Sequence, residues 1–409
     1  MMIDRRSVLK GAAAVAGSAA VAPHVRAAGE PIKIASIYDL SGGLEGVGKP
    51  MHDLLMMAVD EINGGGGLLG RKIEVVSYDS QTSVQVAAQY AQEAALKNKV
   101  AVAHGGITSA SREAMRPVFD RYRTLYFYDT PYEGGVCDRN IFCTGSTPRQ
   151  NTDRLVAHAL KAWGKKGYVL AADYNYGQIT TDWVKKLAKD GGGEVVGNEF
   201  FPLDATNFGS TISKIQAANP NWILTVLVGA PTISFYRQYA AAGLNSKIPV
   251  TSTTFGAGHE ELTLKPEESD GIVVCYNYIQ SIDSPVNKAF LKRYYERFGK
   301  DALSVTDLAM SSYQSVHLWA EGVKKAGSLD RMKQIEALET GISYDSPSGK
   351  VSLEKSTHHA IFDTHLGVFK NREIQVIESY PQQRAVDTEE VCNLVKKPND
   401  HQQYVIKVK

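Results

Sequence analysis

Short apolar runs and longer amphipathic stretches alternate along the first third of the chain. The runs at 32–38, 72–77, 100–103 and 125–128 have the length of buried strands. Between the first two, residues 48–63 place apolar side chains at helical spacing. That stripe is formed by Met51, Leu54, Leu55, Ala58, Val59 and Ile62. The repeated order of strand, helix and strand predicts a doubly wound α/β lobe.

The same alternation restarts near residue 150 and predicts a second α/β lobe. Strands are expected at 167–172, 194–201, 222–227, 249–254 and 271–278, and helices at 151–163, 180–189, 207–218 and 233–242. Further helices are expected at 281–298, 306–326 and 330–340. Strands at 350–353, 360–369 and 374–379 read as antiparallel additions, and the polar stretch 380–409 as a tail that wraps the surface.

Two hydroxyl-rich loops follow neighbouring apolar runs in the stretch 101–135. The first carries Ser109 and Ser111 just before a predicted helix, and the second follows the run that ends at Tyr128. In an open parallel sheet both loops leave carboxyl ends of strands, where such folds bind ligands. The N–H groups behind the serines suit a carbonyl or carboxylate oxygen. Helix capping by Ser109 and simple packing by Tyr128 and Tyr132 remain the alternative; a binding site is favoured.

Charge and composition exclude several classes of partner. The 409 residues are 43% hydrophobic and 22% charged, with a formal net charge of +1, which indicates neither nucleic acid nor a membrane surface as a partner. Residues 1–27 contain a twin-arginine-like motif with Arg5 and Arg6, followed by an Ala-rich apolar stretch. They end in Val25-Arg26-Ala27, which has the small residues of a signal-peptidase cleavage site. This order predicts a cleaved export signal.

Four cysteines are present, and an exported chain can pair them. Cys137 and Cys143 lie close in the sequence and are predicted to form a short disulfide; the alternative is that both are free. Cys275 lies in an apolar run and is expected to be a buried thiol. The state of Cys392 is left open. The spacing fits no zinc pattern, so no metal or other cofactor is expected.

Catalytic patterns are weak in this sequence. There is no G-x-S-x-G elbow, and the pair His358-His359 lacks a metal-ligand frame and suggests a solvated turn. Glu260 and Glu261 are adjacent, so in a helix they point to different faces and make a poor acid/base pair. A binding protein is therefore expected in preference to an enzyme.

Taken together and in order, several short motifs resemble the periplasmic solute-binding proteins of ABC importers, in the leucine/isoleucine/valine-binding class. The likeness is closest to the branch that binds urea and short-chain amides. It is carried by AVDEINGGGGLLG, TSASR, TPYEG, NIFCTGSTP, SIDSP and Ser348-Gly349-Lys350-Val351. The resemblance implies two doubly wound α/β lobes joined by three crossovers near Pro148, Asn277 and Gly349. The implied lobes are 31–148 plus 279–349 and 149–278 plus 350–379, with 380–409 as a tail.

The resemblance also implies a ligand site in the cleft between the lobes. The positions that match the amide-site residues are Ser109, Tyr128, Thr130, and Tyr174 or Tyr176. Ala110, Asp129 and Gly229 complete the set of expected ligand-binding residues. Asp129 stands where a related amide binder has proline, which changes the polarity of the expected site. The implied protein is a monomeric periplasmic receptor that captures urea, a short-chain amide or a branched-chain amino acid for the permease subunits of an ABC importer. The alternative is a regulatory amide sensor of the same fold.

Overall fold

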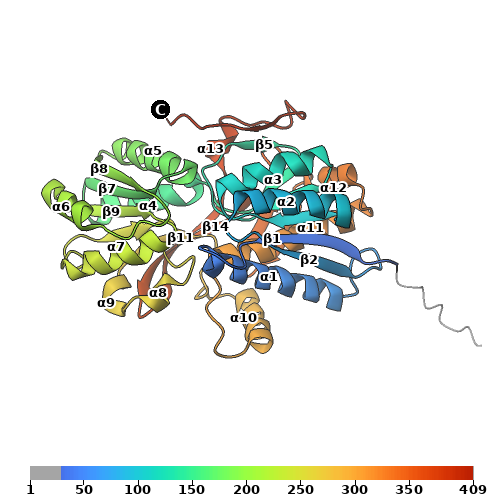
Figure 1. Ribbon diagram of the computed structural model, residues 1–409, viewed down its shortest axis with the longest axis horizontal. Helices are drawn as coiled ribbons and strands as arrows, with labels where there is room; N and C mark the ends of the chain where they lie inside the picture. The colour runs from blue at the N-terminus through green and yellow to red at the C-terminus, as the bar shows by residue number, and fades with distance from the viewer. Residues whose placement is uncertain (1–28, 409) are drawn as a thin grey trace, which may run out of the picture.

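A parallel five-stranded sheet forms the centre of the first lobe, called the N lobe (Figure 1). The computed structural model describes residues 29–408. The strand order is β2-β1-β3-β4-β6. The strands are β1 (Ile32–Tyr38), β2 (Ile73–Asp79), β3 (Val102–Gly105), β4 (Leu125–Tyr128) and β6 (Ile141–Cys143). All are largely buried on both faces except β2 at the edge, as expected for a parallel sheet covered by helices.

Helices cover both faces of this sheet. The predicted stripe from Met51 to Ile62 is confirmed, because all its residues are buried in α1 (Glu45–Gly64), which packs against α11 (Asp307–Ala326). The opposite face is covered by α2 (Val84–Glu93), which continues into a short π-helix (Ala94–Asn98), and by α3 (Ser109–Arg121). The remaining helices of this lobe are α10 (Pro285–Phe298) and α12 (Arg331–Leu338).

The second lobe, called the C lobe, repeats this plan. Its parallel strands are β7 (Lys166–Ala172), β8 (Glu194–Phe201), β9 (Trp222–Val226), β10 (Val250–Ser252) and β11 (Val273–Tyr276). Its helices are α4 (Pro148–Ala162), α5 (Asn175–Asp190), α6 (Gly209–Ala218), α7 (Ala230–Ala241), α8 (Glu260–Thr263) and α9 (Pro266–Ser269). One core cluster lies under α6 and α7 and another under α4 and α5, so helices again cover both faces.

Four antiparallel strands complete the molecule, and one of them connects the two lobes. They are β12 (Ser343–Ser346), β13 (Gly349–Leu353), β14 (Ala360–Lys370) and β15 (Glu373–Gln383). The 11-residue strand β14 begins in the N-lobe core with Phe362 and ends in the C-lobe cores with Leu366 and Phe369. The third passage between lobes therefore lies within β14, later than the predicted boundary at Gly349, because one strand is long enough to serve both cores.

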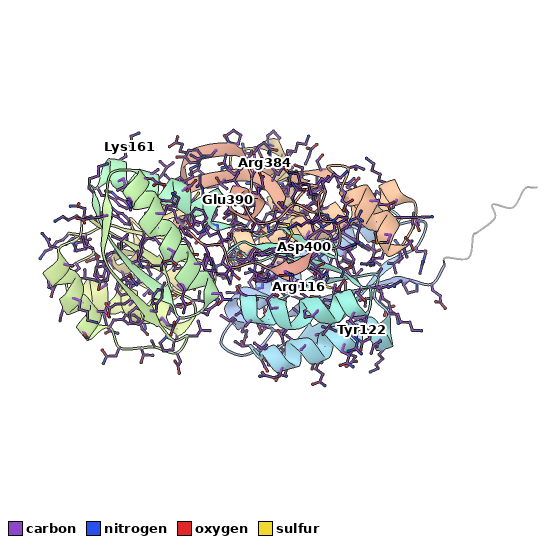
Figure 2. All side chains as sticks on the ribbon, turned by 90° about the horizontal axis from the view of Figure 1, so that it is seen from above. Arg116, Tyr122, Lys161, Arg384, Glu390 and Asp400 are labelled. Atoms are coloured by element: carbon purple, nitrogen blue, oxygen red, sulfur yellow. A yellow bond between two sulfur atoms is a disulfide. The ribbon has the colours of Figure 1, made fainter. Side chains whose placement is uncertain are left out.

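The C-terminal segment 384–408, which we call the strap, runs across both lobes (Figure 1). It contains α13 (Val386–Glu389) and β16 (His401–Gln403), which pairs with β5 (Val136–Asp138) of the N lobe. Further along, Ile406 packs against Ile179 and Trp183 of α5 in the C lobe. In Figure 2, Glu390 and Asp400 of the strap lie between Lys161 of the C lobe and Tyr122 of the N lobe.

The predicted Cys137–Cys143 disulfide is wrong. Cys137 is bonded to Cys392 of the strap, with the two Cα atoms 5.3 Å apart. The reason is topological: Cys137 lies on β5, which pairs with the strap, whereas Cys143 lies on β6 inside the main sheet. Cys143 and Cys275 are buried free thiols, as expected for Cys275.

The histidine pair is also placed differently from the prediction of a solvated turn. His358 and His359 are each 1% exposed. His358 stacks on Phe142 at a centroid distance of 4.1 Å, and His359 contacts the Tyr132 hydroxyl. Burial lowers the pKa of His359 to about 4, so this ring is neutral inside the N lobe.

The predicted export signal, residues 1–27, lies outside the described residues. Within 29–408, no helix combines the length and the apolar character that a membrane crossing requires.

Candidate functional site

A cavity lies between the lobes, at the carboxyl ends of the parallel strands of both sheets. The N lobe contributes the loops after β3 and β4, and the C lobe contributes the loops after β7, β9 and β10. The polar residues that line it are Thr108, Ser109, Thr130, Tyr174, Tyr176, Thr253, Thr254 and Glu260. The apolar residues are Leu44, Val47, Ile107, Pro131, Leu227, Val228, Ala257 and Leu308, with Gly229 between them. The cavity therefore combines an apolar wall with polar groups from two lobes.

The N terminus of α3 forms one end of this cavity. Thr108 caps the helix, since its hydroxyl oxygen accepts from the N–H of Ser111 at 3.1 Å. Ser109 and Ala110 are the next residues, and the N–H groups of a first helical turn have no intrahelical acceptor. Ser109 lines the cavity, as predicted, while the side chain of Ala110 is exposed outside it.

The Ser109 hydroxyl is held from behind by a buried ion pair. It donates to Oε2 of Glu133 at 2.5 Å, and Oε1 of the same carboxylate accepts from Arg112 at 2.9 Å. Both charged side chains are fully buried. The Arg112 guanidinium also lies over the Tyr132 ring, 4.4 Å from its centroid. This arrangement fixes Ser109 at the cavity wall.

Two predicted site residues lie beneath the cavity instead of lining it. The Tyr128 side chain is fully buried under α3 and its hydroxyl donates to the carbonyl of Ile107 at 2.9 Å. Asp129 is also fully buried and accepts from Tyr38 at 2.5 Å and from Thr144 at 3.0 Å. Burial raises the pKa of Asp129 to about 7. These residues support the loop that carries Thr130, and the structure does not bring them to the cavity.

Thr130 reaches the cavity because the loop after β4 turns over Gly145. A Cβ added to Gly145 would lie 2.1 Å from the carbonyl carbon of Thr130, so only glycine fits here. The Thr130 hydroxyl donates to the carbonyl of Gly106 at 2.9 Å. Its position in the cavity wall agrees with the prediction.

The C lobe contributes two tyrosines and the start of α7. Tyr174 is the residue before α5 and Tyr176 lies in its first turn, with ring centroids 6.3 Å apart. The Tyr176 hydroxyl donates to Oγ1 of Thr253 at 3.0 Å. Gly229 precedes α7 with a φ of 74°, a left-handed conformation that favours glycine. All three predicted residues therefore line the cavity.

Sequence reasoning missed Glu260, Thr253 and Thr254. The carboxylate of Glu260 accepts from the N–H groups of Gly256 at 2.8 Å and Gly258 at 3.2 Å, and burial raises its pKa. The local sequence signal for this contact is the glycine-rich turn Phe255-Gly256-Ala257-Gly258. Such a turn does not show which side chain accepts hydrogen bonds from its N–H groups.

Comparison with known proteins agrees with this architecture. A family model described as periplasmic binding protein matches residues 31–373. The chain belongs to this family. Its two-lobed α/β fold is the type I fold of periplasmic binding proteins.

Relatives within the family are distant in sequence and similar in structure. A leucine-, isoleucine-, valine-, threonine- and alanine-binding protein of Pseudomonas aeruginosa is 25% identical, over 88% of this chain and 94% of that protein. A Leu/Ile/Val-binding protein homolog of Brucella melitensis is 26% identical over 58% of this chain, and the match spans 63% of that relative's length. A solved solute-binding protein from R. palustris in complex with 4-hydroxybenzoate superposes with a TM-score of 0.77 at 25% identity, covering 87% of this chain and 98% of that chain.

Proposed function

We propose that this protein is the solute-binding receptor of an ABC importer and captures a small solute in the cavity between its lobes. The observation that carries the proposal is the cavity wall itself, to which each lobe contributes both polar and apolar groups. A solute that contacts Ser109 and Tyr174 together makes its full set of contacts only when the lobes are closed. Binding then stabilises the closed form that a permease recognises.

The lining favours a solute with a polar head and a short apolar body. The polar head fits the N terminus of α3 beside Ser109 and Thr130, and the body fits the wall that includes Leu227 and Leu308. A branched-chain amino acid or a short-chain amide has both parts, whereas urea has no apolar body. Among the three solute classes expected from the sequence, the apolar wall therefore favours branched-chain amino acids and short-chain amides over urea.

The family context supports the receptor role over the alternative of a regulatory sensor. The P. aeruginosa relative matches over nearly the whole of both chains and is an amino-acid-binding protein, and the R. palustris structure is a transporter component. An export signal in residues 1–27 and permease subunits as partners follow from the same role. Asp129 is not the partner of a ligand ammonium in this proposal, because its carboxylate is enclosed by Tyr38 and Thr144.

A calorimetric screen of the purified protein tests the proposal. The panel contains branched-chain amino acids, short-chain amides, urea and hydroxybenzoates, since the last class occupies a solved relative. Removal of a buried ligand hydrogen bond by Tyr174→Phe should weaken binding roughly ten- to hundredfold. Tyr90→Phe is the matched control, because Tyr90 lies on α2 and does not line the cavity. If no solute of these classes binds, the receptor proposal is wrong.

A further inference from the structure

Three hydroxyl groups of the cavity, those of Ser109, Thr130 and Thr254, share one property: their protons point into the protein. Thr130 donates to the carbonyl of Gly106 at 2.9 Å, and Thr254 donates to the carbonyl of Leu227 at 2.6 Å. A carbonyl can only accept, so the direction of both bonds is fixed. Each hydroxyl has a single proton, and what it can offer to a solute is therefore a lone pair.

The Ser109 hydroxyl also directs its proton into the protein, toward a carboxylate. Its proton is given to Glu133 at 2.5 Å, and that carboxylate is fully buried. If Ser109 turned its proton toward a solute, one oxygen of Glu133 would lose its partner inside the protein. An unpartnered buried carboxylate oxygen costs roughly ten- to hundredfold in affinity, so the hydroxyl stays an acceptor toward the cavity.

The ion pair behind Ser109 is itself held in place from two sides. The Arg112 Nη2 group donates to Glu133 and to the side-chain oxygen of Gln403 in the strap, each at 2.9 Å. The ring of Tyr132 packs on the guanidinium. Glu133 therefore has a fixed orientation, with one oxygen directed to Arg112 and the other to Ser109.

We propose that Glu133 determines the specificity of the site by making Ser109 a hydrogen-bond acceptor, so that the cavity selects a primary amide head group over the isosteric carboxylate. The N–H groups at the start of α3 suit the amide oxygen. The lone pair of Ser109 suits the amide N–H, and Thr130 offers a second acceptor on the same wall. A carboxylate has no N–H, and its second oxygen would face the Ser109 lone pair. The inference rests on the proposed function, since it assumes that this cavity binds the solute.

Replacement of Glu133 by glutamine reverses the direction of the hydrogen bond between residue 133 and Ser109, while the side chain at position 133 keeps its shape. Arg112 can only donate, so it takes the amide oxygen of the new side chain and leaves the NH₂ group facing Ser109. Ser109 must then accept from that group, and its own proton turns toward the cavity. E133Q should therefore change the preference of the site in favour of carboxylates.

The experiment compares matched amides and acids, isobutyramide with isobutyrate and benzamide with benzoate, by calorimetry. The parent protein should bind the amide of each pair at least tenfold more tightly. E133Q should shift the amide-to-acid ratio of dissociation constants by tenfold or more toward the acid. The control is E113Q: Glu113 also contacts Arg112, at 3.0 Å, but faces partly to solvent, and its replacement should leave the ratio unchanged.

Ser109→Ala provides an independent test if E133Q does not fold. It should weaken amide binding ten- to hundredfold but not acid binding, because it removes the lone pair that faces the second carboxylate oxygen. Preference of the parent for the acids, an unchanged ratio in E133Q, or equal losses of both classes in S109A would overturn the inference. In those cases solute binding itself would still be seen, so the receptor proposal would stand. If neither member of any pair binds while another solute of the screen does, the inference is likewise overturned.

Discussion

The strap disulfide is expected to stabilise the whole protein, and Cys392→Ser tests this. The bond joins residues 255 positions apart, so it closes most of the chain into one loop in the unfolded state. The chain-entropy model gives roughly 5 kcal/mol for a loop of this length, near the upper end of what disulfides contribute. Cys392 is also buried beside Leu394, so a serine hydroxyl at this position adds a further cost.

Guanidinium denaturation of parent and C392S, each with and without reductant, measures this contribution. The oxidised parent should unfold at the highest denaturant concentration, and reductant should lower its midpoint toward that of the variant. Reductant should leave C392S unchanged. Limited proteolysis should then cut within 384–408 first, since the strap is then held by noncovalent contacts alone, among them those of β16, Asp387 and Ile406. Equal midpoints for all four samples, or four reactive thiols in the oxidised parent, would refute the reasoning.

Three further predictions concern the loop beneath the site, the buried carboxylate and the N terminus. Gly145→Ala should push the backbone of Thr130, lower stability by about 1–3 kcal/mol in a thermal melt and weaken solute binding, whereas Gly64→Ala, which has open space around it, should do neither. Burial raises the pKa of Asp129 to about 7, so the folded state holds this proton more tightly than the unfolded chain, whose pKa is roughly 4. The stability that this group contributes is full below pH ~4 and is lost as pH rises through ~7. Asp129→Asn should therefore flatten the pH dependence of the free energy of unfolding in urea between pH ~4 and ~7. An unchanged pH dependence would contradict the assignment. N-terminal sequencing of periplasmic protein should begin close after Ala27, and a chain that still begins at Met1 would disprove cleavage.

Much of the fold follows from local pattern, because each lobe repeats strands and helices of ordinary length. The stripe of α1 and the restart of the alternation near residue 150 predicted two α/β lobes, and the structure has both. The loops after β3 and β4 were expected to carry the site, and Ser109 and Thr130 do line the cavity.

The side-chain assignments that failed depend on information that is not local. The run 125–128 is buried on both faces, so its pattern does not show that Tyr128 faces α3 instead of the cleft. The partner of Cys137 is far along the chain, and only the pairing of β5 with β16 brings it close. Glu260 reaches the cavity because the Gly256 turn accommodates its carboxylate, which is a feature of the tertiary structure.

The most direct test of the central claim is a calorimetric titration of a variant whose cavity is filled. Ala257 lines the cavity from the C lobe and is only partly buried, so Ala257→Trp places an indole ring in the solute's position. We predict that this variant melts like the ligand-free parent but gives no binding heat and no thermal shift with the solute found in the screen. Binding as tight as that of the parent would show that the solute site lies elsewhere.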